Sequence, residues 1–260
     1  MHPSLRMDSL TISAASGMRA LMDTLNMSAN NLANSSTSGF KADKEFYGLY
    51  TSAEAQADAD AQGYLASTVP VVESQYTDFA QGMLINTGNS LDLGLNGKGF
   101  FAADGPSGPL YTRNGNFKLT SDGTLVTHEG YPVRTTTNIN NKNVPIQTQS
   151  TSPLEVTPEG EVIQDGQTLG TLELDNFADT RVLSKQGNNY FRVEDPNAQP
   201  VPVTETQVEQ GKLEGSNVQT AGAAVRLVHV MRQFEMLQKA VSISGDMNKH
   251  AVEEVARVGS

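Results

Sequence analysis

The chain has 260 residues, with 29 acidic and 18 basic side chains, and a formal net charge of −11 at pH 7. This balance disfavours nucleic-acid binding, because contacts with phosphates require clustered Lys and Arg. The chain contains no cysteine, which excludes disulfides and thiolate metal sites. No apolar run reaches the roughly 20 residues that span a bilayer. Met1 to Leu25 also lacks the continuous apolar stretch of a cleavable signal peptide.

The N-terminal segment from about Thr11 to Leu32 is predicted to be an amphipathic helix. Its small and apolar residues recur at alternating intervals of three and four, which is the spacing of a heptad seam. The pattern stops at the turn formers from Asn34 to Gly39. The side chains expected to pack in this seam are Met18, Leu21, Leu25 and Leu32.

The middle of the chain is predicted to be rich in β-strands. Residues 41 to 94 are ambiguous, apart from an extended run at Val69–Phe79. From Ser90 to about Val203, alternating apolar residues are separated by turn dipeptides, which is the pattern of hairpins. We expect Tyr111–Asn114 and Phe117–Thr120 to flank one such turn. The dipeptides are Asn96-Gly97, Asp104-Gly105, Asn114-Gly115, Asp122-Gly123 and Asp165-Gly166.

The C-terminal segment, from about Ala221 to Val258, is predicted to be a second amphipathic helix. Its seam is expected to include Leu227, Met231, Phe234 and Val241. Neither terminal helix has a neighbouring helix along the chain. Each stripe is therefore expected to be buried against the other or against further copies of the chain. This organisation is typical of an assembly subunit.

No catalytic group emerges from the residues themselves. The four histidines lack metal-ligand spacing. The string Gly97-Lys-Gly99-Phe-Phe-Ala102 formally matches a dinucleotide-binding pattern, but a phosphate-binding loop must open a helix. These glycines fall between strand-like runs, so we predict a bulge or tight turn there. We expect a protein that is not an enzyme and that has no cofactor and no metal site.

One string couples the end of the first helix to a polar turn and an aromatic residue. It reads Ser28-Ala-Asn-Asn-Leu-Ala-Asn-Ser-Ser-Thr-Ser-Gly-Phe40 and resembles the ANNLAN-x-x-T-x-GF signature of the flagellar rod and hook family. The segments at 96–101, 111–117, 122–126, 213–218 and 232–236 are also similar to that family. The residues that carry the resemblance include Asn30, Asn31, Leu32, Asn34, Gly39, Phe40, Gly97, Gly99, Phe100, Arg113 and Gly115.

The resemblance implies an α+β fold in three parts. Discontinuous N- and C-terminal helices, at 1–40 and 215–260, are expected to form a coiled-coil-like core layer. An extended connecting region is expected at 41–94 and 204–214, and an inserted β-rich outer domain at 95–203.

The implied function is structural, in the axial rod of the bacterial flagellar basal body. The implied partners are copies of the chain, other rod and hook subunits, and the flagellar type III export apparatus. That apparatus is expected to read Met1 to about Phe40 without cleavage. Neither nucleic acid nor insertion into a membrane is expected.

Several alternatives stay open at the level of sequence. The L-E-G-S-N-V and F-E-M forms lean toward a proximal rod type, whereas the long Gly39–Gly99 spacing leans toward a distal rod type. Residues 249–260 extend past the usual end of the last helix and fit neither type. A peptidoglycan-acting enzyme would need paired acid and nucleophile carboxylates, which are not recognisable here. The absence of Trp disfavours a glycan-binding module.

Overall fold

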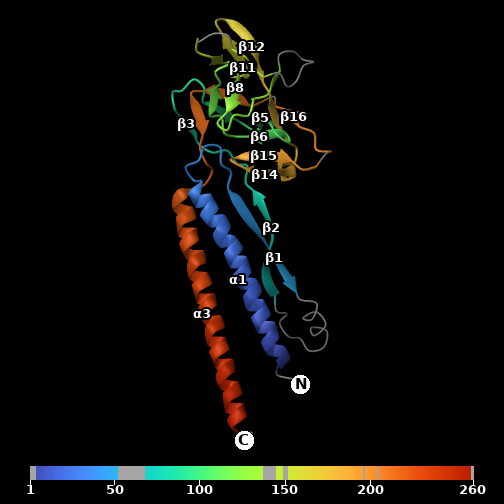
Figure 1. The fold of residues 1–260 in the computed structure, drawn as a ribbon, viewed down its shortest axis with the longest axis vertical. Coiled ribbons are helices and arrows are strands. Elements are labelled where there is room, and N and C mark those ends of the chain that lie inside the picture. Colours follow the sequence, from blue (N-terminus) through green and yellow to red (C-terminus); the bar gives the residue numbers. More distant parts are fainter. Residues whose placement is uncertain are drawn as a thin grey trace. The chain divides into compact units, whose positions relative to one another are not determined.

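The computed structural model describes residues 4–51, 68–136, 145–148, 152–195, 197–203 and 205–258. The fold is α+β, as predicted, because two terminal helices flank a β-rich insertion (Figure 1). The chain divides into two compact units. A helical unit consists of Met1–Ala33, Asp43–Tyr76 and Gln219–Ser260, and a β-rich unit consists of Asn34–Ala42 and Thr77–Val218.

These units divide the chain differently from the expected three-part organisation. Part of the expected connecting region, Asp43–Tyr76, clusters with the helices, although residues 52–67 within it lie outside the described residues. The segment Asn34–Ala42, expected to continue the helical part, clusters with the β-rich unit instead. The three-part division therefore stays a prediction, and the two compact units are used below.

The helical unit contains two long helices and a two-stranded sheet. Helix α1 spans Ser4–Ala33 and helix α3 spans Thr220–Val258, and the two run side by side (Figure 1). Strand β1 (Asp43–Thr51) pairs with β2 (Thr68–Thr77). Gly17 of α1 faces α3, since a Cβ atom there would lie 3.5 Å from Cδ2 of Leu237, in ordinary van der Waals contact.

Buried and half-buried side chains follow a heptad spacing along α3, and a matching series runs along α1. Val230 is 4% exposed and lies in this seam, whereas Met231 is 46% exposed. Both residues satisfy a three-four spacing from Leu227 to Phe234, so the sequence could not distinguish them. The contact of Met231 with other copies of the chain stays a prediction. The seam of α3 comprises Ala223, Leu227, Val230, Phe234, Leu237, Val241 and Ser244.

The β-rich unit is built from antiparallel pairs. A six-stranded sheet has the order β14-β15-β6-β5-β13-β16, and a four-stranded sheet has the order β10-β11-β12-β9. Three two-stranded ribbons pair β7 with β8, β17 with β4, and β18 with β3. A 3-10 helix at Thr180–Val182 precedes β14.

The first strands of this unit are β3 (Leu84–Asn86), β4 (Leu93–Asn96), β5 (Phe100–Gly105), β6 (Gly108–Thr112), β7 (Phe117–Leu119), β8 (Leu125–Thr127), β9 (Thr135–Thr136) and β10 (Glu155–Val156). The later strands are β11 (Glu161–Gln164), β12 (Gln167–Leu172), β13 (Leu174–Asn176), β14 (Leu183–Gly187), β15 (Tyr190–Val193), β16 (Val201–Pro202), β17 (Gln207–Gln210) and β18 (Lys212–Glu214).

Turn dipeptides predicted some hairpins correctly and one wrongly. Asp165 and Gly166 have φ angles of 51° and 76° and form the turn between β11 and β12, as expected for a two-residue hairpin. The hairpin expected across Asn114-Gly115 is absent, because β6 pairs with β5 and β15 and β7 pairs with β8. Instead, the oxygen of Gly115 accepts a hydrogen bond from the amide of Leu93 at 3.0 Å. The loop at Asn114-Gly115 is therefore hydrogen-bonded to strand β4.

Two apolar clusters flank strand β5, because successive side chains of a strand point to opposite faces. Phe101 lies in one cluster and meets Phe117 edge to face at a centroid distance of 5.1 Å. Phe100 lies in the other cluster, together with Tyr111 and Phe191. This double burial explains why both aromatic residues of the Phe100-Phe101 pair are almost inaccessible to solvent.

Tyr111 should make the β-rich unit sensitive to alkaline pH. Burial, followed by the nearby carboxylate of Asp175, raises the pKa of Tyr111 to about 12. Above its ordinary pKa, the unfolded chain releases this proton while the folded chain keeps it, so stability falls as pH rises. At pH 11 the expected loss from this residue is about 1.4 kcal/mol relative to neutral pH.

The measurement is urea unfolding of wild type and Tyr111→Phe at pH 8 and pH 11. The variant should lose less stability than wild type over this interval, by about the amount attributed to Tyr111. Equal losses in the two proteins would contradict the burial assigned to this phenol.

Candidate functional site

A buried carboxylate organises the residues around the family-type motifs. Glu214 lies at the end of β18 and is 1% exposed. Its Oε1 accepts hydrogen bonds from Nζ of Lys41 at 2.5 Å and from the amide of Gly82 at 2.8 Å. Its Oε2 accepts from Nη1 of Arg113 at 3.1 Å. These three charged side chains are called the Lys41–Glu214–Arg113 cluster below.

The two cations of the cluster have further partners. Nζ of Lys41 donates to the carbonyl of Ala80 at 2.8 Å, and Nη2 of Arg113 donates to the carbonyl of Gly97 at 2.8 Å. The guanidinium carbon of Arg113 also lies 5.4 Å from the centre of the Phe100 ring. Burial lowers the pKa of Lys41, and the Glu214 carboxylate opposes this shift. Such partners are what allow charges to be buried.

The main chain around the cluster is tied together as well. The amide of Gly39 donates to the carbonyl of Glu214 at 2.7 Å, and the amide of Gly215 donates to the carbonyl of Met83 at 2.8 Å. The side chain of Asn217 accepts from the amide of Ala42 at 2.8 Å and donates to the carbonyl of Asp78 at 2.7 Å. The residues around 39–42, 78–83 and 214–217 therefore form one hydrogen-bonded junction within the β-rich unit.

The hairpin of β14 and β15 also holds the first of these segments, through Lys185 in β14 and Asn189 in the turn. Nζ of Lys185 lies 4.5 Å from the centre of the Phe40 ring and donates to the carbonyl of Lys41 at 2.7 Å. The side chain of Asn189 donates to the carbonyl of Ser38 at 3.1 Å. Phe40 is itself buried. The Gly39-Phe40 end of the long motif is thus fixed by packing, hydrogen bonds and a cation over the ring.

The glycines of the motifs allow close main-chain contacts. Gly39 has φ +71°, and a Cβ atom there would lie 2.4 Å from the amide nitrogen of Asn114. A Cβ atom at Gly115 would lie 1.8 Å from the carbonyl oxygen of Leu93. Gly97 and Gly99 have φ angles of +126° and +125° in the turn between β4 and β5. That turn joins two strands, as predicted, and opens no helix.

The asparagines of the motif fall in both units. In the helical unit, the side chain of Asn31 donates to the carbonyl of Asp43 at 2.8 Å and accepts from its amide at 3.0 Å. It therefore fixes the start of β1 against the end of α1. In the β-rich unit, Asn34 accepts at its carbonyl from the amide of Thr37 at 3.1 Å and begins the polar turn. Roles for Asn30 and Leu32 stay predictions.

Sequence reasoning selected Arg113 but missed Lys41 and Glu214. The ion pair of Lys41 with Glu214 joins residues 173 positions apart, and Lys and Glu are usually exposed. Lys41 directly follows the long motif, and Glu214 lies inside the L-E-G-S-N-V string. Their place beside motif residues was the signal that could have drawn attention to them.

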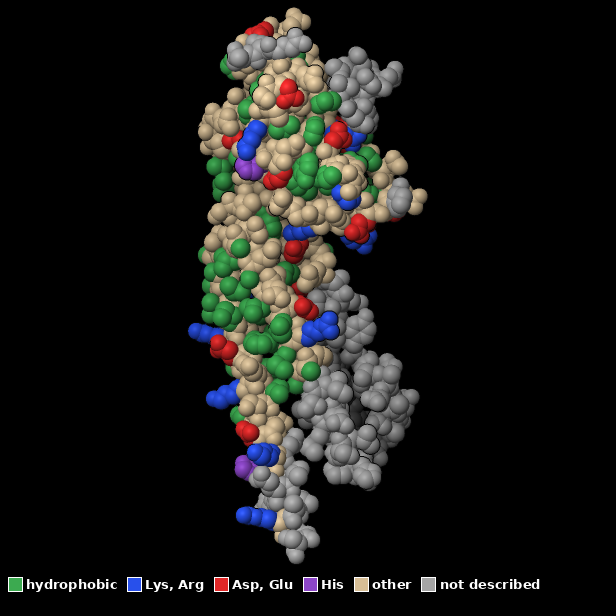
Figure 2. Space-filling view, viewed as in Figure 1, with side chains coloured by type: hydrophobic (Ala, Val, Ile, Leu, Met, Phe, Trp, Pro, Cys, Tyr) green, Lys and Arg blue, Asp and Glu red, His purple; other side chains and the backbone are tan. Residues whose placement is uncertain are grey.

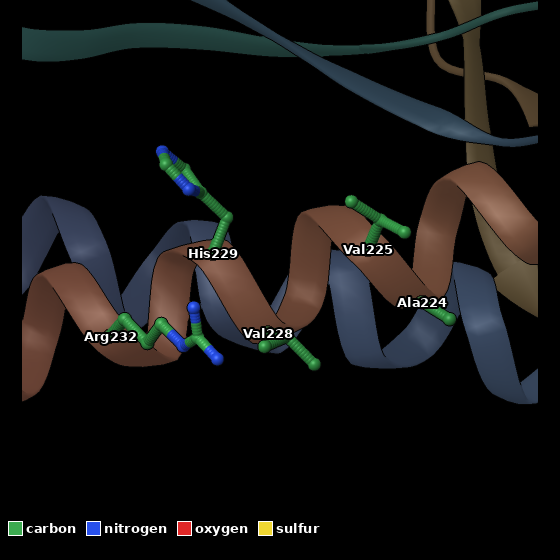
Figure 3. A pocket seen from close by; sticks show the side chains of 5 residues that line it. All are labelled: Ala224, Val225, Val228, His229 and Arg232. Atoms are coloured by element: carbon green, nitrogen blue, oxygen red, sulfur yellow. The ribbon is translucent and has the colours of Figure 1, made fainter.

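A second candidate surface lies on the helical unit. Figure 2 shows hydrophobic side chains exposed along this unit. The expected seam residues Met18, Leu21, Leu25, Leu32, Leu227, Phe234 and Val241 are half-buried. Val228 and Met236 face outward on α3, with exposed fractions of 49% and 64%. An open hollow of about 350 Å³ lies on α3 (Figure 3) and is lined by Ala224, Val225, Val228, His229 and Arg232.

Other chemistry is not apparent in the part of the chain that the structure describes. Among these residues, no three His, Asp or Glu side chains are placed to hold a metal ion. None of the described helices is both long enough and apolar enough to cross a membrane.

Gly39→Ala should destabilise the β-rich unit more than a matched glycine substitution. Gly166 has a similar φ of +76°, but no atom lies within 4 Å of its Cβ position. Gly166→Ala should therefore cost only the strain of the left-handed backbone, about 1–2 kcal/mol. Gly39→Ala adds the steric overlap with Asn114, for a total of about 2–5 kcal/mol. Urea unfolding measures both losses, and equal losses would argue against the close contact at Gly39.

Comparison with known families gives matches to three segments of the chain. The family described as "Flagella basal body rod protein" matches residues 13–41. The "Flagellar hook protein FlgE/F/G D1 domain" matches residues 94–164, and the "Flagellar basal body rod FlgEFG protein C-terminal" matches residues 209–253. Lys41, Arg113 and Glu214 each lie in a different one of these segments.

Individual relatives are similar over nearly the whole chain. The flagellar basal-body rod protein FlgF of Caulobacter vibrioides is 30% identical over 97% of this chain and 100% of its own length. The FlgG protein of Agrobacterium fabrum is 34% identical over 90% of this chain and 94% of its own. The FlgG protein of Buchnera aphidicola subsp. Acyrthosiphon pisum is 32% identical over 89% of this chain and 94% of its own length.

Proposed function

The chain belongs to the family of flagellar basal-body rod proteins, and we propose that copies of it stack helically through their terminal helices into the axial rod. The observation that carries this proposal is the apolar surface of α3. Val230 and Phe234 of α3 lie in the seam with α1. Val228 and Met236 are exposed on other faces of the same helix. Heterologous contacts that do not close into a ring produce a helical array.

The outward side chains of α3 are suited to helix packing against a neighbouring subunit. Val225, Val228 and Met236 are apolar, and Arg232 lies beside them on the wall of the hollow. An apolar helix face that is not covered within the chain is a candidate contact surface. The proposed partners are copies of this chain and other rod and hook subunits.

We place the chain in the proximal, FlgF-type position of the rod. Support comes from the forms Leu213-Glu-Gly-Ser-Asn-Val218 and Phe234-Glu-Met236, and from the FlgF relative that aligns over its full length. The alternative is the distal, FlgG-type position, because FlgG relatives reach similar identity. Isolating rods and locating the tagged subunit along the axis would decide between the two positions.

An enzymatic or glycan-binding role on peptidoglycan is the alternative of a different class. Glu214 is a buried acidic side chain among charged partners, but it is only 1% exposed and accepts from three donors. Sugar hydrolysis instead needs two carboxyl groups beside a site that admits substrate. We therefore propose a role without catalysis, which a peptidoglycan hydrolysis assay on purified protein tests directly.

Substitution of the outward face of α3 should stop assembly without unfolding the protein. Met236→Asp places a charge on an exposed apolar position, so the isolated protein should melt as wild type does. In the assembled rod, the same charge would be buried without a partner, which is strongly unfavourable. Motility and recovery of rods from cells measure the effect. Gln238→Asp is the matched control at an exposed polar position of the same helix and should remain motile.

If Met236→Asp cells swim and build rods as wild type does, that position is not a subunit contact. If the purified variant unfolds, Val228→Asp provides a second position on the exposed surface of α3. Loss of rods with Met236→Asp and with the control alike would mean that added charge, not this surface, blocks assembly.

The export apparatus is proposed to read the N-terminal segment without cleaving it. Gly39, Phe40 and Lys41 pack within the β-rich unit, so the decisive deletion covers residues 2–33 rather than 2–40. This deletion should leave the protein in the cytoplasm with the β-rich unit folded. Mass spectrometry of protein from basal bodies should find a chain that starts at Met1 or at His2. Cleavage within the first 30 or so residues would favour a conventional signal peptide instead.

A further inference from the structure

We infer that Lys41, Arg113 and Glu214 act as an electrostatic clasp, which fixes the segments where the chain enters and leaves the β-rich unit. The entering segment, Asn34–Ala42, is the first stretch of the chain in this unit, and the leaving segment ends at Val218, after the chain has passed through the helical unit and returned at Thr77. Lys41 belongs to the first segment and Glu214 to the second, whereas Arg113 follows β6 in the body of the unit. One carboxylate thus contacts both connecting segments and the sheet.

The clasp is directional because its contacts are hydrogen bonds with defined geometry. The two oxygens of Glu214 receive donors from three places in the sequence, at 2.5, 2.8 and 3.1 Å. Apolar packing at this point could tolerate sliding of one segment past another. A carboxylate shared by an ammonium, a guanidinium and a main-chain amide has one satisfied arrangement, and displaced arrangements leave a buried charge without a partner.

The main chain is consistent with such a function. The amide of Gly39 donates to the carbonyl of Glu214, so the two connecting segments are joined directly beside the side-chain contact. The side chain of Asn217 then bonds to the amide of Ala42. The two segments are therefore joined at two places, Gly39 to Glu214 and Ala42 to Asn217.

A buried ion pair need not increase net stability, because desolvation opposes the attraction between the charges. For this reason we assign the clasp the role of positioning the two connecting segments and not that of increasing net stability. It goes beyond the proposed function, since the assembly surface lies on α3 whereas the clasp lies wholly within the β-rich unit. Its direct consequence is a low rate of local opening at the amides of Gly39, Gly82 and Gly215, which bond to or beside Glu214.

Hydrogen exchange on full-length purified protein tests the clasp. The principal variant is Lys41→Met, which keeps an unbranched side chain of similar length and leaves the Glu214–Arg113 pair intact. We expect these three amides to exchange about tenfold faster, while amides at the centre of the four-stranded sheet exchange as in wild type. The control is Lys212→Met, which removes the partly exposed pair of Lys212 in β18 with Glu209 in β17 and should change none of the three rates.

A second variant tests the cluster if the first fails to fold. The triple substitution Lys41→Met, Arg113→Met and Glu214→Leu removes all three charges together, so no charge is left buried alone. Faster exchange at the three amides without faster exchange in the four-stranded sheet supports the clasp in either variant. Wild-type exchange at these amides, or an equal acceleration throughout the β-rich unit, overturns it.

The exchange measurement does not depend on rod assembly, so it remains decisive even if the proposed function is wrong. Motility provides the link between the two proposals. Cells carrying Lys41→Met should swim less well than cells carrying Lys212→Met, provided that both proteins reach the flagellum. Equal motility with faster exchange at the three amides would confine the clasp to the isolated subunit and overturn its role in the rod.

Discussion

The organisation of the β-rich unit depends on burying one carboxylate among donors that come from distant parts of the chain. Glu214 requires Lys41 and Arg113 as partners because an ionised group without them would be costly in the interior. Gly39 must lack a side chain for the entering segment to approach Asn114. The charges, the glycine and the main-chain bonds therefore constrain one another.

The helical unit is held together mainly by apolar packing instead of buried charges. Its seam is apolar and repetitive. The seam therefore determines that the helices pair, but it does not fix how far one helix is shifted along the other. Asn31 supplies a fixed point, since its side chain bonds to both polar main-chain groups of Asp43. Gly17 of α1 faces Leu237 of α3 within this seam. The outward apolar side chains of α3, such as Met236, are exposed and form the contact surface that we propose for neighbouring subunits.

Local patterns predicted the elements better than their partners. Heptad spacing identified both helices, but it could not choose between Val230 and Met231, which occupy equivalent intervals. Asp165-Gly166 predicted its hairpin because the turn alone determines the pairing. The hairpin predicted at Asn114-Gly115 does not form, because the carbonyl of Gly115 accepts a hydrogen bond from Leu93 in another strand. Residue type and local spacing could not predict the contact of Lys41 with Glu214, because only the folded chain buries them together; their place beside motif residues was the one available signal.

The course of the chain between its two units has a mechanical consequence. The chain passes from one unit to the other four times, after Ala33, Ala42, Tyr76 and Val218. A single tether transmits little torque, because rotation about its bonds relieves any twist. Four covalent passages share the load, so twisting either unit stretches several peptide segments at once. In a flagellar rod subunit with this connectivity, load that passes between the two units is carried by four stretches of covalent backbone.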